Sequence, residues 1–275
     1  MKVRKCAVAG QFYPDSEEKI NELIGKIYSK EKGKIKKEFY NTEIVGGVVP
    51  HAGYVYSGYE AVHFFDILKN SSEKYDTIVI LNPSHSGLGE EISIDNSEKW
   101  ESPYGSIEVD TEFCDEMELP YSDIAQKYEH SGEVMLPFLE YFLNYDFKIV
   151  PVTINFQNYQ NAKITADRIF EANKVLKRKI AIIASSDFSH YELPEQAMKH
   201  DDIILRDIKE FNSKKLYDDI IKNGITVCGY GPIMALMEYT KLVRMEPKSS
   251  ILRRGSSGEV AKMEKVVDYI SMLFY

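Results

Sequence analysis

Cysteine is scarce in this sequence, and long apolar runs are missing from it. Its 275 residues include three cysteines, which lie far apart and form no C-x-x-C pair: Cys6, Cys114 and Cys228. That number and spacing exclude a disulfide framework and fit a reducing compartment. No segment approaches the roughly 20 consecutive apolar residues that span a bilayer, and the apolar stretch after the basic N-terminus is too short for a secretory signal. We therefore expect a cytoplasmic protein.

Sequence motifs of three common enzyme classes are also missing. The chain contains no G-x-S-x-G nucleophile elbow, no G-x-x-x-x-G-K-[ST] phosphate loop and no G-x-G-x-x-G dinucleotide fingerprint. Their absence argues against serine hydrolases, P-loop enzymes and dinucleotide enzymes. The formal net charge of −9 disfavours electrostatic attraction to nucleic acid or to anionic lipid. We expect neither nucleic acid nor a membrane as a partner.

The order of apolar and amphipathic segments predicts an α/β fold. Apolar runs typical of strands alternate with segments in which apolar residues recur at helical spacing. No stretch resembles a linker, so we expect one domain over residues 1–275, with a mainly parallel or mixed central sheet flanked by helices. The expected strands are residues 44–49, 77–81, 92–95, 148–153 and 180–184, and a C-terminal hairpin of 249–254 and 262–273. The expected helices include 111–117, 161–174, 194–211 and 233–243, and residues 100–105 are expected to form a loop.

Histidines follow three of the expected strands, each in the turn after its strand. They are His51, His85 and His190. In an open α/β sheet, the loops that leave the carboxyl ends of the strands hold the chemistry, because the sheet fixes their positions beside a crevice. The pattern therefore predicts a functional site at this edge. We expect the histidines in helical segments, His63 and His200, to be packed or solvated instead.

A metal site is the first interpretation of these loops. Neutral imidazole and thiolate are strong ligands for late first-row divalent ions, and three ligands leave coordination positions open. His51, His85 and Cys228 are the candidate ligands. Their wide separation along the chain is not diagnostic, and loop histidines can instead satisfy backbone carbonyl groups. We expect Cys114, which has no such neighbours, to be a core residue.

Two further histidines are candidates for proton transfer or ligand binding. Asp187 precedes His190 by three residues, and a carboxylate can orient an imidazole and raise its basicity for general acid–base catalysis. In the alternative interpretation, Asp187 and Ser186 only cap a turn. His130 lies just before an apolar helical segment with Ser131 as a candidate N-cap, where an anion would be in a favourable field.

Six ordered motifs resemble those of Memo-family proteins. They are residues 9–14, 50–54, 82–85, 129–131, 185–190 and 228–229, and the resemblance runs from about residue 6 to the C-terminus. It implies the fold of LigB-like class III extradiol dioxygenases, whose non-haem iron is held by two histidines and a glutamate. By the same resemblance, His51 and His85 match the two histidines, and Cys228 takes the place of the third ligand. His190 matches an acid–base histidine, and His130 lines the site.

The third ligand separates this chain from the dioxygenases. A thiolate is softer than a carboxylate and is itself open to oxidation, so dioxygenase activity does not transfer with the fold. The resemblance implies Fe(II), with copper or zinc as the other candidates, and an unknown small-molecule substrate. It also implies, for prokaryotic members, association with a radical SAM protein and an AMMECR-like protein.

Three functions remain open from the sequence. The leading prediction is a metal-dependent oxidoreductase in which His190 moves a proton. The second is a non-catalytic binding module whose cleft recognises a peptide or a phosphorylated ligand, as the resemblance implies for vertebrate members that bind phosphotyrosine peptides. The third is a zinc hydrolase, which zinc-selective rescue of activity after chelation would distinguish from the others.

Overall fold

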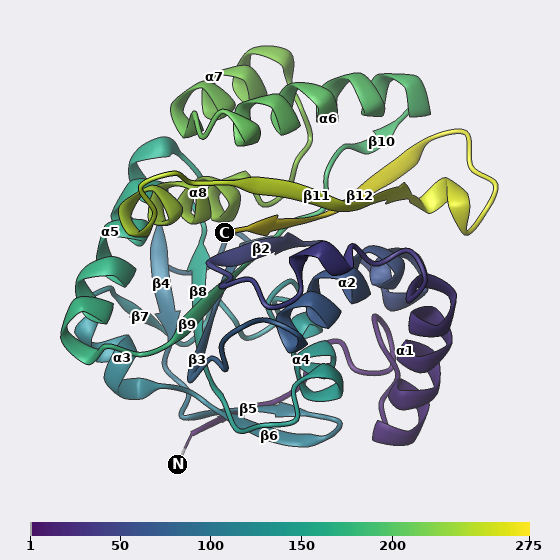
Figure 1. The fold of residues 1–275 in the computed structure, drawn as a ribbon. Coiled ribbons are helices and arrows are strands. Elements are labelled where there is room, and N and C mark those ends of the chain that lie inside the picture. The colour runs from purple at the N-terminus through teal and green to yellow at the C-terminus, as the bar shows by residue number, and fades with distance from the viewer. Residues whose placement is uncertain (1) are drawn as a thin grey trace.

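The computed structural model describes residues 2–275 and confirms the α/β class (Figure 1). Its strands are β1 (Val3–Arg4), β2 (Gly46–Val49), β3 (Thr77–Pro83), β4 (Ile92–Asp95), β5 (Lys99–Ser102), β6 (Gly105–Glu108), β7 (Tyr121–Ser122), β8 (Lys148–Ile154), β9 (Ile180–Ser185), β10 (His190–Glu192), β11 (Ser249–Ser256) and β12 (Val266–Phe274). Its α-helices are α1 (Glu17–Glu31), α2 (Tyr54–Lys69), α3 (Thr111–Glu116), α4 (Leu136–Phe142), α5 (Tyr159–Leu176), α6 (Pro194–Lys209), α7 (Ser213–Asn223) and α8 (Tyr230–Val243). Three short 3-10 helices cover Lys37–Phe39, Glu133–Met135 and Ser257–Glu259 within this described part.

The main sheet is mixed, with a parallel centre. Over residues 2–275 it has nine strands in the order β10-β12-β2-β9-β3-β8-β4-β7, with β11 paired to β12. The four central strands β2, β9, β3 and β8 are parallel, and β12 and β4 join them antiparallel. The central strands are buried along nearly their whole length, because helices cover both faces of a parallel sheet. The predicted C-terminal hairpin is confirmed by the β11–β12 pairing.

Two groups of helices cover the two faces. On one face α2 packs against β2 and β12, and α1 and α4 pack against α2. On the other face α8 packs against β2, β3 and β9, with α5 beside it. Figure 1 shows α1 and α2 in purple and dark blue with α4 in teal beside them, and α5 and α8 in teal to yellow-green. Along the part of the chain that is described, no helix is both long and apolar enough to span a bilayer.

Two adjacent glycines let both helix layers approach β2. A Cβ added to Gly46 would lie 2.9 Å from a methyl carbon of Leu236 in α8, and one added to Gly47 would lie 2.3 Å from the ring of Phe64 in α2. Neighbouring residues of a strand point to opposite faces, so the pair admits one helix on each side. The segment that ends at His51 is therefore held between two helices.

Substitution of Gly47 by alanine is expected to destabilise the fold. The added methyl would meet Phe64 at 2.3 Å and the Met272 carbonyl oxygen at 2.4 Å, and overpacking of this kind costs about 1–3 kcal/mol. We expect urea unfolding to show this loss for Gly47→Ala. Gly33→Ala is the control, since nothing lies within 4 Å of its added carbon. Equal stability of the two variants would contradict the account.

One expectation about local structure is wrong, and one helix was not predicted. Residues 100–105 do not form a loop alone: β5 and β6 are antiparallel, and β1 pairs with β5 to make a three-stranded sheet within residues 2–275. Trp100 is fully buried there, so tertiary burial favours strand in a segment rich in polar residues. Helix α7 was also not expected. Its apolar side chains, Leu216 and Ile220, are buried, and Gly224 ends the helix in the left-handed conformation.

Candidate metal centre

Three neighbouring strand ends bring the candidate site together. Strand β9 lies between β2 and β3, and all three are parallel, so the loops that carry His51, His85 and Asp187 leave the sheet at the same edge. Val49, near the end of β2, is in register with Ser185 at the end of β9. The predicted grouping of loop residues at the carboxyl edge thus follows from the strand order.

Cys228 reaches the same place from the loop before α8. This loop passes so close to β9 that a Cβ on Gly229 would lie 2.2 Å from the Ser185 carbonyl oxygen, a contact that only glycine permits. The Gln157 side chain holds the loop from the other side, donating to the Cys228 carbonyl at 2.8 Å and accepting from the Gly231 amide at 2.7 Å.

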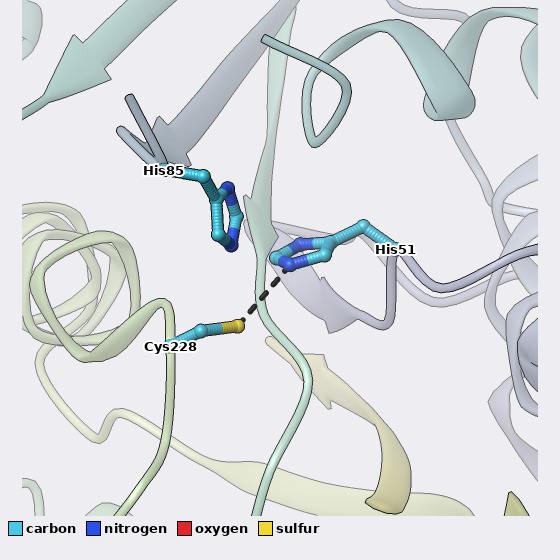
Figure 2. Close-up of side chains that lie close together, drawn as sticks. All are labelled: His51, His85 and Cys228. Atoms are coloured by element: carbon cyan, nitrogen blue, oxygen red, sulfur yellow. Dashed lines mark hydrogen bonds between the residues drawn. The ribbon is translucent and has the colours of Figure 1, made fainter. Parts of the chain in front are cut away.

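The three predicted ligands converge. One ligand atom from each of His51, His85 and Cys228 lies within 4.8 Å of the other two. Figure 2 shows the three side chains pointing toward one another, and a dashed line joins Cys228 Sγ to His51 Nε2, which are 3.1 Å apart. The set matches the donors that zinc, copper and iron take in proteins. These residues therefore fit a first-row metal ion.

Glu129 orients His85. Its carboxylate accepts a hydrogen bond from His85 Nδ1 at 2.9 Å and another from the His85 backbone amide at 2.7 Å. A carboxylate has no proton to give here, so Nδ1 carries the proton and Nε2 keeps its lone pair for a metal. Burial opposes ionisation of Glu129, but the hydrogen bonds from His85 and Ser131 lower the pKa of Glu129 to about 2.

His130 lies beside both candidate histidine ligands. Its ring centroid is 5.3 Å from that of His51 and 4.5 Å from that of His85, and Phe12 packs on it at 4.5 Å. Burial lowers the pKa of His130 to about 4, although Glu129 raises it. His130 is therefore neutral at pH 7 and lines the site as a hydrogen-bonding group.

Asp187 and His190 have different partners. The Asp187 carboxylate accepts from the His51 backbone amide at 2.7 Å, and burial raises its pKa to about 6 against that bond. His190 Nδ1 lies 2.8 Å from the Thr226 carbonyl oxygen. Within residues 2–275, no hydrogen bond joins the Asp187 carboxylate to the His190 ring. Asp187 thus holds the His51 loop, Thr226 orients His190, and acid–base roles for both stay predictions.

The protonation states of His51 and Cys228 suit a site in which a metal ion replaces a proton. Burial, with smaller contributions from the neighbouring histidines, lowers the pKa of His51 well below its ordinary value. Burial and the nearby Asp187 carboxylate raise the pKa of Cys228 well above its ordinary value. Without a metal the pair is a thiol beside a neutral imidazole, and metal binding must release the thiol proton.

Sequence reasoning did not assign two residues that hold the histidine ligands. Glu129 immediately precedes His130, and Ser185 is the last residue of β9; both lay inside motifs but were given no role. Ser185 Oγ is 2.7 Å from His51 Nδ1. Metal-bound histidines usually donate their second ring proton to an oxygen acceptor, so a polar residue at a neighbouring strand end is a signal that could have identified Ser185.

The remaining predictions about single residues are settled by burial and contacts. His63 is buried and bonds Glu31 at 3.1 Å, and His200 bonds Glu192 at 3.1 Å. Cys114 is a buried core residue, as predicted.

A cavity of about 960 Å³ opens at the opposite edge of the sheet. Its walls include Thr77 and Lys148, the first residues of β3 and β8. It shares no residue with the metal-ligand group, and Arg178 in its wall pairs with Asp110 at 3.3 Å. The candidate chemistry therefore does not lie in this cavity.

Two buried carboxyl groups anchor the loop that carries Asp187 and His190. Asp201 accepts from the Ser189 hydroxyl at 2.7 Å and from the Ser189 amide at 3.1 Å. Asp268 shares a hydrogen bond with Asp201 and bonds the same loop through its backbone, and Arg254 lies 3.2 Å from Asp201. Burial and the neighbouring Asp201 raise the pKa of Asp268 to about 7.

This pair is expected to make stability depend on pH. The folded pKa of Asp268 is raised to about 7 above an unfolded value of about 4, so its stabilising contribution is present below pH 4 and is lost as the pH rises through 7. Between pH 4.5 and 8, we expect the free energy of unfolding of Asp268→Asn to fall by about 1–3 kcal/mol less than that of the parent. Urea unfolding at a series of pH values measures this difference. Asp218→Asn, on an exposed helical ion pair, is the control. Identical pH profiles for Asp268→Asn and the parent would rule out the shared proton.

The comparisons with known proteins agree on one family. The family model described as Memo-like protein matches residues 4–273. A MEMO1 family protein of Methanobrevibacter smithii is 40% identical over 284 residues, with 99% of each chain covered. One from Methanocaldococcus jannaschii is 37% identical over 285 residues, again with 99% of each chain covered.

A solved structure supports the fold alone. The crystal structure of an uncharacterized protein from Escherichia coli K12 is similar with a TM-score of 0.53 and 11% sequence identity, over 78% of this chain and 91% of that chain. The family assignment rests on the family match and the archaeal relatives. The match extends over nearly the whole chain and both relatives are covered almost end to end, so the chain belongs to the Memo family.

Proposed function

We propose that this protein is a metal-dependent oxidoreductase that binds Fe(II), or alternatively copper, through His51, His85 and Cys228, and acts on a small molecule. The observation that carries the proposal is the approach of these three ligand atoms to within 4.8 Å of one another. The identity of the metal and the class of substrate are both part of the proposal.

The surroundings of the ligands favour a reactive site over a closed structural one. Structural zinc sites take four protein ligands, whereas three ligands leave positions for water or substrate. The His85 side chain is 38% exposed, although Glu129 behind it is fully buried. A bound iron or copper ion would supply Lewis acidity and one-electron redox capacity. The accessible side at His85 is where a substrate would enter.

The protein's own groups can hold and move protons there. His130 is neutral at pH 7 and faces the two histidine ligands, so it can accept a hydrogen bond from a bound substrate. The Thr226 carbonyl accepts from His190 Nδ1, which leaves His190 Nε2 unprotonated in the neutral ring. An unprotonated ring nitrogen is the atom that a general base requires.

Metal analysis after anaerobic purification tests the proposal. We expect about one iron or copper ion per chain, and oxygen uptake by the loaded protein when a suitable small molecule is added. Reconstitution with zinc alone should support no oxygen uptake. Zinc-selective recovery of a hydrolytic activity would favour the zinc hydrolase, and failure to bind iron, copper or zinc would end the metal proposal.

A binding module is the second candidate, and exposed aromatic side chains favour it. Tyr128 and Phe156, which lie in loops, and Tyr191, which lies in the short strand β10, are each at least 60% exposed. Tyr13 and Tyr54 are buried and offer no such surface. Calorimetry with a tyrosine-phosphorylated peptide, with and without chelator, tests this candidate. Binding that survives chelation, without turnover, would favour the module over the oxidoreductase.

A further inference from the structure

We propose that Ser185 is a positioning residue that holds His51 in the tautomer with its proton on Nδ1, so that Nε2 faces Cys228 and the metal position. This inference rests on the proposed function for its effect on metal binding. Its effect on the metal-free protein does not depend on that function.

The direction of two hydrogen bonds carries the inference. Ser185 Oγ lies 2.7 Å from the Ser131 carbonyl oxygen and 2.7 Å from His51 Nδ1. A carbonyl oxygen only accepts, and a hydroxyl has one proton. The Ser185 proton therefore goes to Ser131, and Ser185 Oγ must accept a proton from His51 Nδ1.

The proton on His51 Nδ1 determines the state of the other ring nitrogen, Nε2. A neutral imidazole has one ring proton, so a ring that donates from Nδ1 has a lone pair on Nε2. His51 Nε2 lies 3.1 Å from Cys228 Sγ, where the lone pair can accept the thiol proton in the metal-free protein. The same lone pair is the one that a metal ion would take. Ser185 thus orients His51 for both states.

One short segment connects the two imidazoles. Ser131 provides the carbonyl that receives the Ser185 proton, and its own hydroxyl donates to Glu129 at 2.7 Å. Glu129 in turn accepts from His85 Nδ1. Residues 129–131 therefore set the tautomer of His85 directly and that of His51 through Ser185. Ser185 can do this because β9 lies between the strands that lead to both histidines.

Removal of the hydroxyl should release the tautomer of His51. In Ser185→Ala the Nδ1 proton loses its acceptor in a buried place, and an unsatisfied buried donor is unfavourable. The tautomer with its proton on Nε2, donating to Cys228, then becomes competitive. That form must lose its Nε2 proton before it can bind a metal. We expect Ser185→Ala to bind metal about 10- to 100-fold more weakly, the usual effect of outer-shell changes, and Ser185→Thr to restore binding.

Nitrogen NMR of the metal-free protein tests the tautomer. With ¹⁵N-labelled histidine, and His51→Gln to assign the signals, the parent should show a protonated Nδ1 and an unprotonated Nε2 for His51. Ser185→Ala should shift both nitrogens toward the other tautomer, and Ser185→Thr should retain the parent pattern. An unchanged tautomer in Ser185→Ala would overturn the inference.

Metal competition with a chromogenic chelator, using Fe(II) or Zn(II) alone, is the second measurement. The control is Ser271→Ala, because Ser271 Oγ is buried in β12 without a hydrogen-bond partner among residues 2–275. This variant should keep the parent's metal affinity and His51 tautomer. If the parent binds no metal, the proposed function fails while NMR still decides the role of Ser185. If the parent binds metal and Ser185→Ala binds it equally well, the inference fails alone.

Discussion

His51→Ala and Cys228→Ser are expected to purify almost free of iron and copper under conditions in which the parent protein is loaded. Each substitution removes one of three donor atoms that lie within 4.8 Å of one another. Loss of a direct ligand should exceed the roughly 10- to 100-fold effect of outer-shell changes, so we expect the affinity to fall by at least about 100-fold. Elemental analysis of anaerobically purified variants, followed by titration with Fe(II), measures this.

Matched variants separate ligand loss from general damage. His200→Ala and Cys6→Ser remove the same residue types at positions where the side chains bond Glu192 and the Glu101 carbonyl. Both should retain the parent's metal content, and all four variants should give parental circular dichroism spectra. If His51→Ala and Cys228→Ser also retained parental metal, the site would have to be abandoned.

Glu133→Ala is expected to cause the largest loss of stability among single substitutions considered for this chain. Glu133 is fully buried and accepts from Arg4 at 2.6 Å, from the amides of Ala7 and Val8 at 2.7 and 3.0 Å, and from the Tyr13 hydroxyl at 2.6 Å. Removal of one partner from a buried ion pair costs about 3–5 kcal/mol, because the other charge stays buried and unpaired. Urea unfolding at pH 7 should show a loss of this size.

Loss of Glu133 should also disturb the candidate metal centre. The segment that Glu133 anchors also carries Phe12, whose ring packs on His130 and whose carbonyl accepts from the Tyr54 amide.

Glu133→Gln keeps the size of the side chain and removes its charge, so we expect a smaller loss of stability than for Glu133→Ala. Glu22→Ala breaks an exposed helical ion pair with Lys26 and should cost less than about 1 kcal/mol. A loss for Glu133→Ala no greater than for Glu22→Ala would show that the buried network is not stabilising.

Local patterns predicted much of the fold because they act within a few residues. The spacing of apolar residues in 161–174 and 180–184 predicted a helix and a strand, and the structure has α5 at Tyr159–Leu176 and β9 at Ile180–Ser185. The same patterns failed at Lys99–Ser102, where burial of Trp100 against other elements favours a strand. That burial depends on distant segments and leaves no local periodicity.

The candidate ligands were predictable, and their partners were not. A histidine after an apolar strand is visible in the sequence, so His51 and His85 could be named together with Cys228. The pairing of Asp187 with His190 was suggested by nearness in sequence. In the folded chain the Asp187 carboxylate bonds the His51 amide, and Thr226 orients His190. Distance along the chain does not determine which atoms meet across neighbouring strands.

The sequence by itself determined the type of most of the long elements and the identity of the candidate donor residues, because periodicity and residue chemistry are local properties. Only the tertiary structure decided that β9 lies between β2 and β3. That strand order places Ser185 against His51, and the chain after β7 returns Glu129 to His85. The hydrogen-bond acceptors that fix the two imidazoles therefore come from segments far away in sequence, since long-range burial of the central strands sets which strands are neighbours.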